Sequence, residues 1–144
     1  MDECVLCLRT AGKSFWIPVA QNAYATAAIA NHQRSRGALL VVPKRHSSTI
    51  AGLSADEATG LYRLVRQSMK VLVATFGPEG INVWQGGRMP EPKYDHVHTH
   101  VCPRYEEAGS YSFAPSDDLP VPAEETRYEL AALIKKNVPA EIAV

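Results

Sequence analysis

Three histidines at strict alternation, His96, His98 and His100, constrain this chain more than any other feature of its sequence. They are three of its five histidines, and the residues between them are valine and threonine. These β-branched residues favour an extended backbone, in which side chains two positions apart point to the same face. The pattern therefore predicts a strand that carries three imidazoles on one face. The strand should end at Pro103, because proline cannot donate to a β-ladder.

The spacing of the three imidazoles indicates that they have different roles. Neighbouring rings would lie about 6.7 Å apart along such a strand and the outer two about 13 Å apart, so one metal ion cannot easily bind all three. A neutral imidazole is a competent nucleophile near pH 7, because its ordinary pKa is about 6.5. Attack on phosphorus would give a covalent histidine intermediate, which splits one difficult displacement into two easier steps.

Three segments of the chain carry a resemblance to a known family. The stretch 96–104, HVHTHVCPR, has the H-x-H-x-H motif with its tail, 37–46 reads GALLVVPKRH, and 82–85 reads NVWQ. Together they resemble the histidine triad (HIT) family, and the tail is similar to the branch that hydrolyses dinucleoside polyphosphates. The resemblance implies a nucleotide hydrolase or transferase. It would cleave the nucleoside-phosphate bond of a dinucleoside polyphosphate or a nucleoside phosphoramidate, through a nucleotidyl-histidine.

The same resemblance implies a role for each histidine of the triad. His98, in the middle, corresponds to the nucleophile, and His100 would orient or stabilise the phosphate. His96 would be either a donor in the site or a zinc ligand. The substrate implied is a purine nucleotide or a dinucleoside polyphosphate.

Four further positions are candidates for substrate binding. Gln85 stands at the offset from the triad of a phosphate-contacting glutamine, and Asn31 is nearest to a ribose-binding Asp or Asn of the family. Lys93 stands where relatives have a phosphate-contacting Ser or Thr, and Arg104 would attract phosphate charge. Simpler interpretations are a loop-edge glutamine, a solvated lysine and a surface arginine. Ala38 departs from the family, because a histidine usually follows the glycine and forms a fourth member of the site.

A second group of candidate ligands begins with a C-x-x-C sequence, Cys4 to Cys7. Such a pair can be redox-active, can bind metal, or can be two buried thiols. The redox interpretation requires a helix directly after the pair, and the sequence does not suggest one. The resemblance to bacterial triad proteins and nucleotidylyltransferases implies a structural zinc ion held by Cys4, Cys7, His46 and His96, in a closed tetrahedral site. No organic cofactor is expected.

Two other functions remain open. In one, adjacent triad histidines bind a catalytic zinc ion whose open coordination position activates water. In the other, motivated by Ala38, the protein is a nucleotide-binding module with little catalysis. Loss of all chemistry on chelation would favour the first, and turnover no faster than that of a His98 variant would favour the second.

Length and composition bound these interpretations. The 144 residues fit one domain, residues 1–144, with a sizeable core. A formal net charge of zero disfavours a nucleic-acid-binding protein, and no apolar run reaches membrane-spanning length. The three cysteines, an odd number, do not make a disulfide framework. The acidic N-terminus lacks the layout of a signal peptide, so we expect the cytoplasm.

The periodicities predict an α+β fold: an antiparallel sheet of about five strands with one long helix packed across it and a C-terminal helix. Ser54 and Glu57 form a capping box, after which an apolar stripe runs to Phe76 and Gly77 ends the helix. A second helix is expected over residues 123–137. Strands are expected over residues 15–19, 24–29, 38–42, 80–85 and the triad segment. The resemblance further implies a homodimer.

Overall fold

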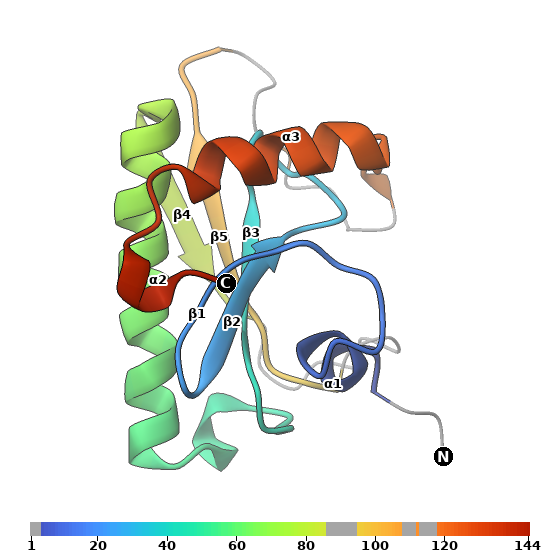
Figure 1. Cartoon of the computed structure of the whole chain (residues 1–144), viewed down its shortest axis with the longest axis vertical. Helices are drawn as coiled ribbons and strands as arrows, with labels where there is room; N and C mark the ends of the chain where they lie inside the picture. Colours follow the sequence, from blue (N-terminus) through green and yellow to red (C-terminus); the bar gives the residue numbers. More distant parts are fainter. Residues whose placement is uncertain (1–3, 86–94, 108–111, 113–117) are drawn as a thin grey trace.

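A computed structural model describes residues 4–85, 95–107, 112 and 118–144 of the chain. Five strands form one antiparallel sheet in the order β1-β2-β3-β5-β4 (Figure 1). The strands are β1 (Pro18–Gln21), β2 (Ala25–Ile29), β3 (Leu39–Pro43), β4 (Gly80–Trp84) and β5 (Thr99–Arg104). The helices are α1 (Val5–Thr10), α2 (Ala55–Phe76) and α3 (Glu124–Lys135), with 3-10 turns at Ile50–Gly52 and Ala140–Ile142. The predicted α+β architecture is confirmed.

The long helix α2 begins at the capping box that the sequence predicts. The Ser54 hydroxyl accepts a hydrogen bond from the backbone N–H of Glu57, and the Glu57 carboxylate accepts one from the N–H of Ser54. Two of the open N–H groups of the first turn are thereby satisfied. The helix ends at Gly77, whose φ of 56° is left-handed and costs glycine little. Its 22 residues are about 33 Å long, enough to cross the sheet.

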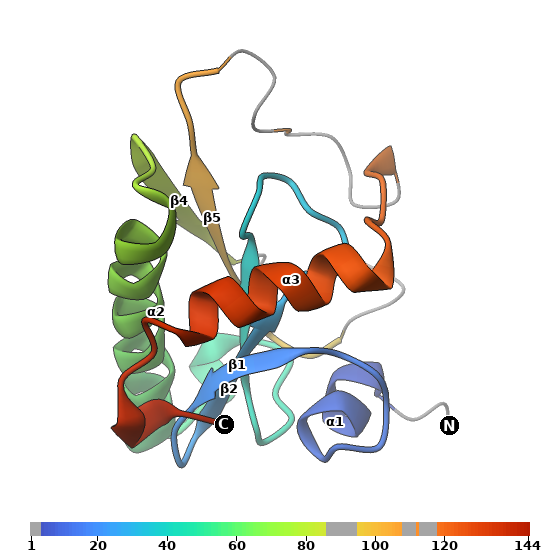
Figure 2. The same ribbon diagram turned by 45° about the horizontal axis from the view of Figure 1, so that its top comes forward.

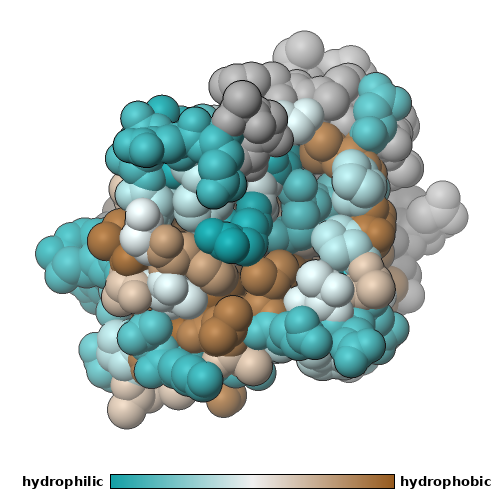
Figure 3. All heavy atoms as spheres, turned by 90° about the horizontal axis from the view of Figure 1, so that it is seen from above, coloured by the Kyte–Doolittle hydropathy of each residue, from teal (hydrophilic) through white to brown (hydrophobic). Residues whose placement is uncertain are grey.

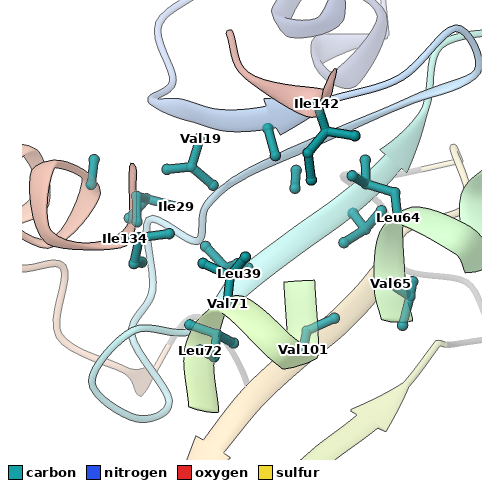
Figure 4. Close-up of a cluster of buried hydrophobic side chains, with 14 of the residues drawn as sticks. Val19, Ile29, Leu39, Leu64, Val65, Val71, Leu72, Val101, Ile134 and Ile142 are labelled. Carbon is teal, nitrogen blue, oxygen red and sulfur yellow. The ribbon is translucent and has the colours of Figure 1, made fainter. Parts of the chain in front are cut away.

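The apolar core lies between one face of the sheet and the helices α2 and α3 (Figures 2 and 4). Leu39 and Val41 of β3 and Val101 of β5 all belong to it and are almost fully buried. Because alternate strand residues point to opposite faces, their neighbours Leu40 and His100 face the other side of the sheet. Within the described residues, the two long helices α2 and α3 both pack on the core face and leave the second face uncovered by either.

The strand predicted for the triad segment begins and ends later in the sequence than expected. β5 begins at Thr99, so His96 and His98 precede it, and it continues through Pro103 to Arg104. The pairs between β3 and β5 end at Val101, and beyond that point β5 is paired with β4. A proline nitrogen in this part of β5 therefore interrupts no bond to β3.

The short helix α1 is also absent from the sequence prediction. It follows Cys4 directly and has no side-chain cap. Six residues are too few for intrinsic propensity to show in a sequence, and a helix of this length depends on tertiary contacts. Leu6, only 1% exposed, supplies such a contact.

The C-terminal helix α3 is close to its predicted extent, packs on β1, β2 and α2, and crosses in front of the sheet in Figure 2. Glu124 and Glu125 occupy its first turn, as the helix dipole favours. Seen from above the view of Figure 1, the surface combines an apolar area with hydrophilic residues around it (Figure 3). None of the helices in the described ranges is both long and apolar enough to span a bilayer.

Candidate functional site

The structure divides the triad between two clusters. His96 is 1% exposed, and its ring lies 4.9 Å from the ring of His46 between centroids. His98 and His100 form a separate pair, with 5.1 Å between centroids and 65° between ring planes. The prediction that one strand carries all three imidazoles on one face is therefore wrong, and the different roles assigned to them stay predictions. The cause is the late start of β5, which leaves the backbone at His96 outside the strand.

The first cluster joins the four predicted metal ligands. Ligand atoms of Cys4, Cys7, His46 and His96 all lie within 4.8 Å of one another. The Sγ atoms of Cys4 and Cys7 are each 3.4 Å from His96 Nδ1, and Cys7 Sγ is 3.3 Å from His46 Nδ1. A zinc ion with tetrahedral angles and normal Zn–S and Zn–N bonds would separate sulfur from nitrogen by about 3.6 Å. Two thiols and two imidazoles at this spacing fit zinc.

The hydrogen bonds of His96 present the correct nitrogen to this cluster. Its Nε2 lies 2.8 Å from the carbonyl oxygen of Pro43. A carbonyl can only accept, so Nε2 carries the proton and Nδ1, with its lone pair, faces the sulfurs. Burial lowers the pKa of His96 and favours this neutral form.

A bound metal ion would change the protonation state of Cys7. Burial and the neighbouring Cys4 thiol raise the pKa of Cys7 to about 11, so the metal-free Cys7 thiol is protonated near pH 7. A bound divalent ion reverses that preference, because it stabilises thiolates directly.

In the second cluster, the ring of His98 is oriented by a hydrogen bond to the backbone carbonyl of His96. Its Nδ1 lies 2.9 Å from the carbonyl oxygen of His96. Nδ1–H is therefore the donor, and in the neutral ring Nε2 carries the lone pair. An imidazole with a fixed tautomer and orientation is the form required of a nitrogen nucleophile.

His100 is stacked on an aromatic side chain of the neighbouring strand. The rings of His100 and Trp84 are 4.4 Å apart between centroids, with 6° between their planes. Burial, then the nearby charges of His98 and Arg34, lower the pKa of His100 to about 3. His100 is therefore neutral at physiological pH and is not a cation.

Comparison with known proteins places the chain in a family. A model of the HIT domain matches residues 17–107. The chain belongs to the HIT family. An adenosine 5'-monophosphoramidase of Schizosaccharomyces pombe is 31% identical over 106 residues, which are 73% of this HIT protein and 77% of the relative.

Solved structures share the fold of this HIT protein. A Hit-like protein of Bartonella henselae has a TM-score of 0.81 at 19% identity, covering 95% of this chain and 97% of that one. A zinc-bound histidine triad family protein of Mycobacterium smegmatis has a TM-score of 0.76 at 20% identity, covering 94% and 93%. At such identities the comparison shows the fold alone.

Two of the predicted substrate-binding residues already have partners within the HIT protein. Gln85 Oε1 accepts a hydrogen bond of 3.0 Å from the hydroxyl of Thr99. Thr99 precedes His100 in β5, so its side chain points to the opposite face of the sheet. Asn31 Oδ1 accepts one of 2.7 Å from Arg127 Nη1 on α3. Substrate contacts by these two side chains stay predictions, and each would require a change of partner or use of the amide N–H₂.

The remaining predicted positions lie farther away or elsewhere. Arg104 is exposed at the end of β5, beside Gly80, and lies about 13 Å along the strand from His100. Lys93 lies outside the described residues. Ala38 is buried beside Cys102 in a small apolar cluster of the histidine face and brings no titratable group there.

The sequence interpretation did not include Trp84 or Arg34 among the site residues, although Trp84 stacks on His100 and the charge of Arg34 acts on it. Trp84 is the residue of β4 directly paired with His100. The guanidinium carbon of Arg34 lies 5.5 Å from the Trp84 ring centroid. Alternation along residues 80–85 assigns Trp84 a face, but only the register between β4 and β5 reveals the residue that it meets.

Proposed function

We propose that this HIT protein hydrolyses a nucleoside-phosphate bond through a nucleotidyl-histidine formed on His98. The observation that carries the proposal is the hydrogen bond from His98 Nδ1 to the carbonyl of His96, beside a neutral His100. Nε2 attacks phosphorus, a new N–P bond forms, and the bond to the leaving group breaks as that group takes up a proton. Water then attacks the same phosphorus, releases a nucleoside monophosphate and restores the imidazole.

His100 would contact a non-bridging oxygen of the phosphate through its N–H group. A donor held in a partly dry site strengthens as negative charge develops on that oxygen. The substrate we propose is a purine nucleoside phosphoramidate, the class named by the Schizosaccharomyces pombe relative, or a dinucleoside polyphosphate. The two classes differ in leaving group and share the nucleoside phosphate that His98 would carry.

We also propose a structural zinc ion at Cys4, Cys7, His46 and His96. The ligand distances support it, as does the zinc-bound relative of the same fold from Mycobacterium smegmatis. When bound, the ion would tie α1 to the ends of β3 and the triad segment. His98 and His100 belong to no group of three or more metal-ligating side chains in the described ranges, so the geometry favours a histidine nucleophile over a catalytic metal.

We propose a homodimer through the β4 edge of the sheet. β4 is the last strand in the order, Val83 is 37% exposed, and a groove between α2 and β4 is lined by Met69, Val73 and Ile81. An exposed edge with apolar neighbours favours pairing with another chain. Val83→Lys should convert a dimer to a monomer in analytical ultracentrifugation.

The function is tested by trapping the adduct. The purified protein is mixed with adenosine 5'-phosphoramidate or a diadenosine polyphosphate, quenched in denaturant and digested for mass spectrometry. We expect an adenylyl group on His98, and none in His98→Asn. His32→Asn is the matched control, because His32 contacts the carbonyl of Leu119 and lies outside the triad.

Two results would contradict the proposal. Turnover by His98→Asn at the parent rate would exclude a nucleophilic His98 and favour a binding module or another catalyst. Complete loss of chemistry on chelation, with the fold intact, would favour the catalytic-zinc alternative.

A further inference from the structure

The three histidines of the triad are held in different ways. His96 is oriented by a hydrogen bond to the carbonyl of Pro43, and His98 by one to the carbonyl of His96. In the part of the chain that the structure describes, the His100 ring makes ring contacts with Trp84 and His98 and no hydrogen bond. The orientation of His100 therefore depends on the rings around it.

We propose that Trp84 is a positioning residue that holds the His100 imidazole in place beside His98. The proposal rests on the function proposed above, since it concerns the same phosphate site. The indole is nearly parallel to the imidazole, at 4.4 Å and 6°, a geometry in which aromatic faces attract. Rotation of His100 about χ2, which is otherwise a soft torsion, would break this contact.

Trp84 packs on the histidine face of the sheet, where it contacts His100, and not in the main core. The core between the sheet and α2 does not include it. Trp84 packs instead on a separate cluster on the histidine face, made of Ala30, Ala38 and Cys102, with Leu40 beside it. The packing against these small buried side chains limits the movement of the Trp84 ring. The fixed indole in turn limits the movement of the His100 imidazole stacked on it.

Arg34 adds a second constraint on the indole. Its guanidinium carbon lies 5.5 Å from the ring centroid, and its Nη1 donates a hydrogen bond of 3.3 Å to the carbonyl of Ser112. The Ser112 N–H in turn donates to the carbonyl of Arg34 at 3.0 Å. A cation over an electron-rich ring is attracted to it, so Trp84 has a partner in the loop 31–37 as well as in β5.

The stack also shields His100 from water. The charged groups nearest to it are His98 in the triad segment and Arg34 in the loop, and both oppose its protonation. Burial is the largest cause of its lowered pKa, and the indole covers one face of the ring. Loss of the indole should therefore release the orientation of His100 and raise its pKa toward the ordinary value of about 6.5.

The test compares Trp84→Leu and Trp84→Met with Trp84→Phe. Phe retains an aromatic face, whereas Leu and Met fill space without one, and either folded aliphatic variant suffices. Two quantities are measured: the pH titration of His100 by NMR, and kcat and KM with adenosine 5'-phosphoramidate. Tyr62→Leu is the control, because Tyr62 is an exposed aromatic residue of α2, the helix that packs on the opposite face of the sheet.

We expect His100 in the aliphatic variants to titrate at higher pH than in the parent. We also expect kcat to fall by about tenfold or more, with a smaller change in KM, and Phe to restore most of both. A folded aliphatic variant in which His100 titrates as in the parent, or keeps parental kcat, would overturn the inference. If the parent turns over no nucleotide, the proposed function fails, and the NMR titration alone decides whether Trp84 positions His100.

Discussion

The side chain of His96 donates a hydrogen bond of 2.8 Å from Nε2 to the carbonyl oxygen of Pro43, at the end of β3. The same residue meets the cysteine sulfurs through Nδ1 and accepts the Nδ1–H of His98 at its own carbonyl. One residue thus connects the candidate metal cluster to the candidate nucleophile. A disturbance of the cluster should therefore reach His98 through the backbone.

Removal of a cysteine ligand should remove the metal and destabilise the fold. We expect Cys7→Ser to bind zinc with far lower affinity than the parent and to melt at a lower temperature, because metal-binding free energy contributes to folding. Metal content by mass spectrometry and Tm with and without chelator measure this. The control is Cys102→Ala, which lies in the separate apolar cluster and should keep its zinc. Equal metal content in both variants would contradict the assignment.

Acidification should destabilise the protein through His100. Its pKa is about 3 in the fold, against 6.5 for the exposed side chain, so between these values the unfolded chain binds more protons. The stabilisation is fully present above pH 6.5 and is lost as pH falls toward 3. Between pH 7 and pH 5 this amounts to about 2 kcal/mol.

Urea unfolding at pH 7 and pH 5 measures the loss. His100→Gln should reduce the difference between the two pH values, and the remainder would come from His96, whose pKa is lowered in the same direction. An unchanged pH dependence in His100→Gln would show that His100 titrates normally in the fold.

Loss of the capping box should weaken α2 without altering the site. Ser54→Ala removes the acceptor for the Glu57 N–H and should cost about 1 kcal/mol of unfolding free energy. Chemical denaturation measures the cost, with Ser14→Ala, outside any helix, as the control. A loss of activity in folded Ser54→Ala, at unchanged stability, would contradict a purely structural role.

Substitution of Gly37 should be worse than substitution of another left-handed glycine. Gly37 has φ 91°, and a Cβ there would collide with the ring of Phe76, whereas Gly12 has φ 74° and open space around it. Both alanine variants carry the left-handed penalty of about 1–2 kcal/mol, and Gly37→Ala adds the collision. Thermal unfolding of the two variants separates these contributions, and equal Tm values would show that Phe76 moves aside at no cost.

Local patterns were sufficient to predict the framework of this protein. The capping box and apolar stripe define α2 within the chain itself, and the run from Leu39 to Val42 defines a buried strand wherever it pairs. Both depend on neighbours a few residues apart, so they can be predicted without knowledge of the rest of the fold.

Contacts between segments far apart in the sequence determine which side chains meet in the candidate site. The alternation of the triad predicted one row, but β5 starts at Thr99, and His96 pairs with cysteines near the N-terminus instead of with His98 and His100. Likewise, Trp84 meets His100 only because β4 and β5 pair in one register. A period along the chain determines which face a side chain takes. Which side chain it meets depends on where the backbone turns and how strands align, and those are properties of the folded molecule.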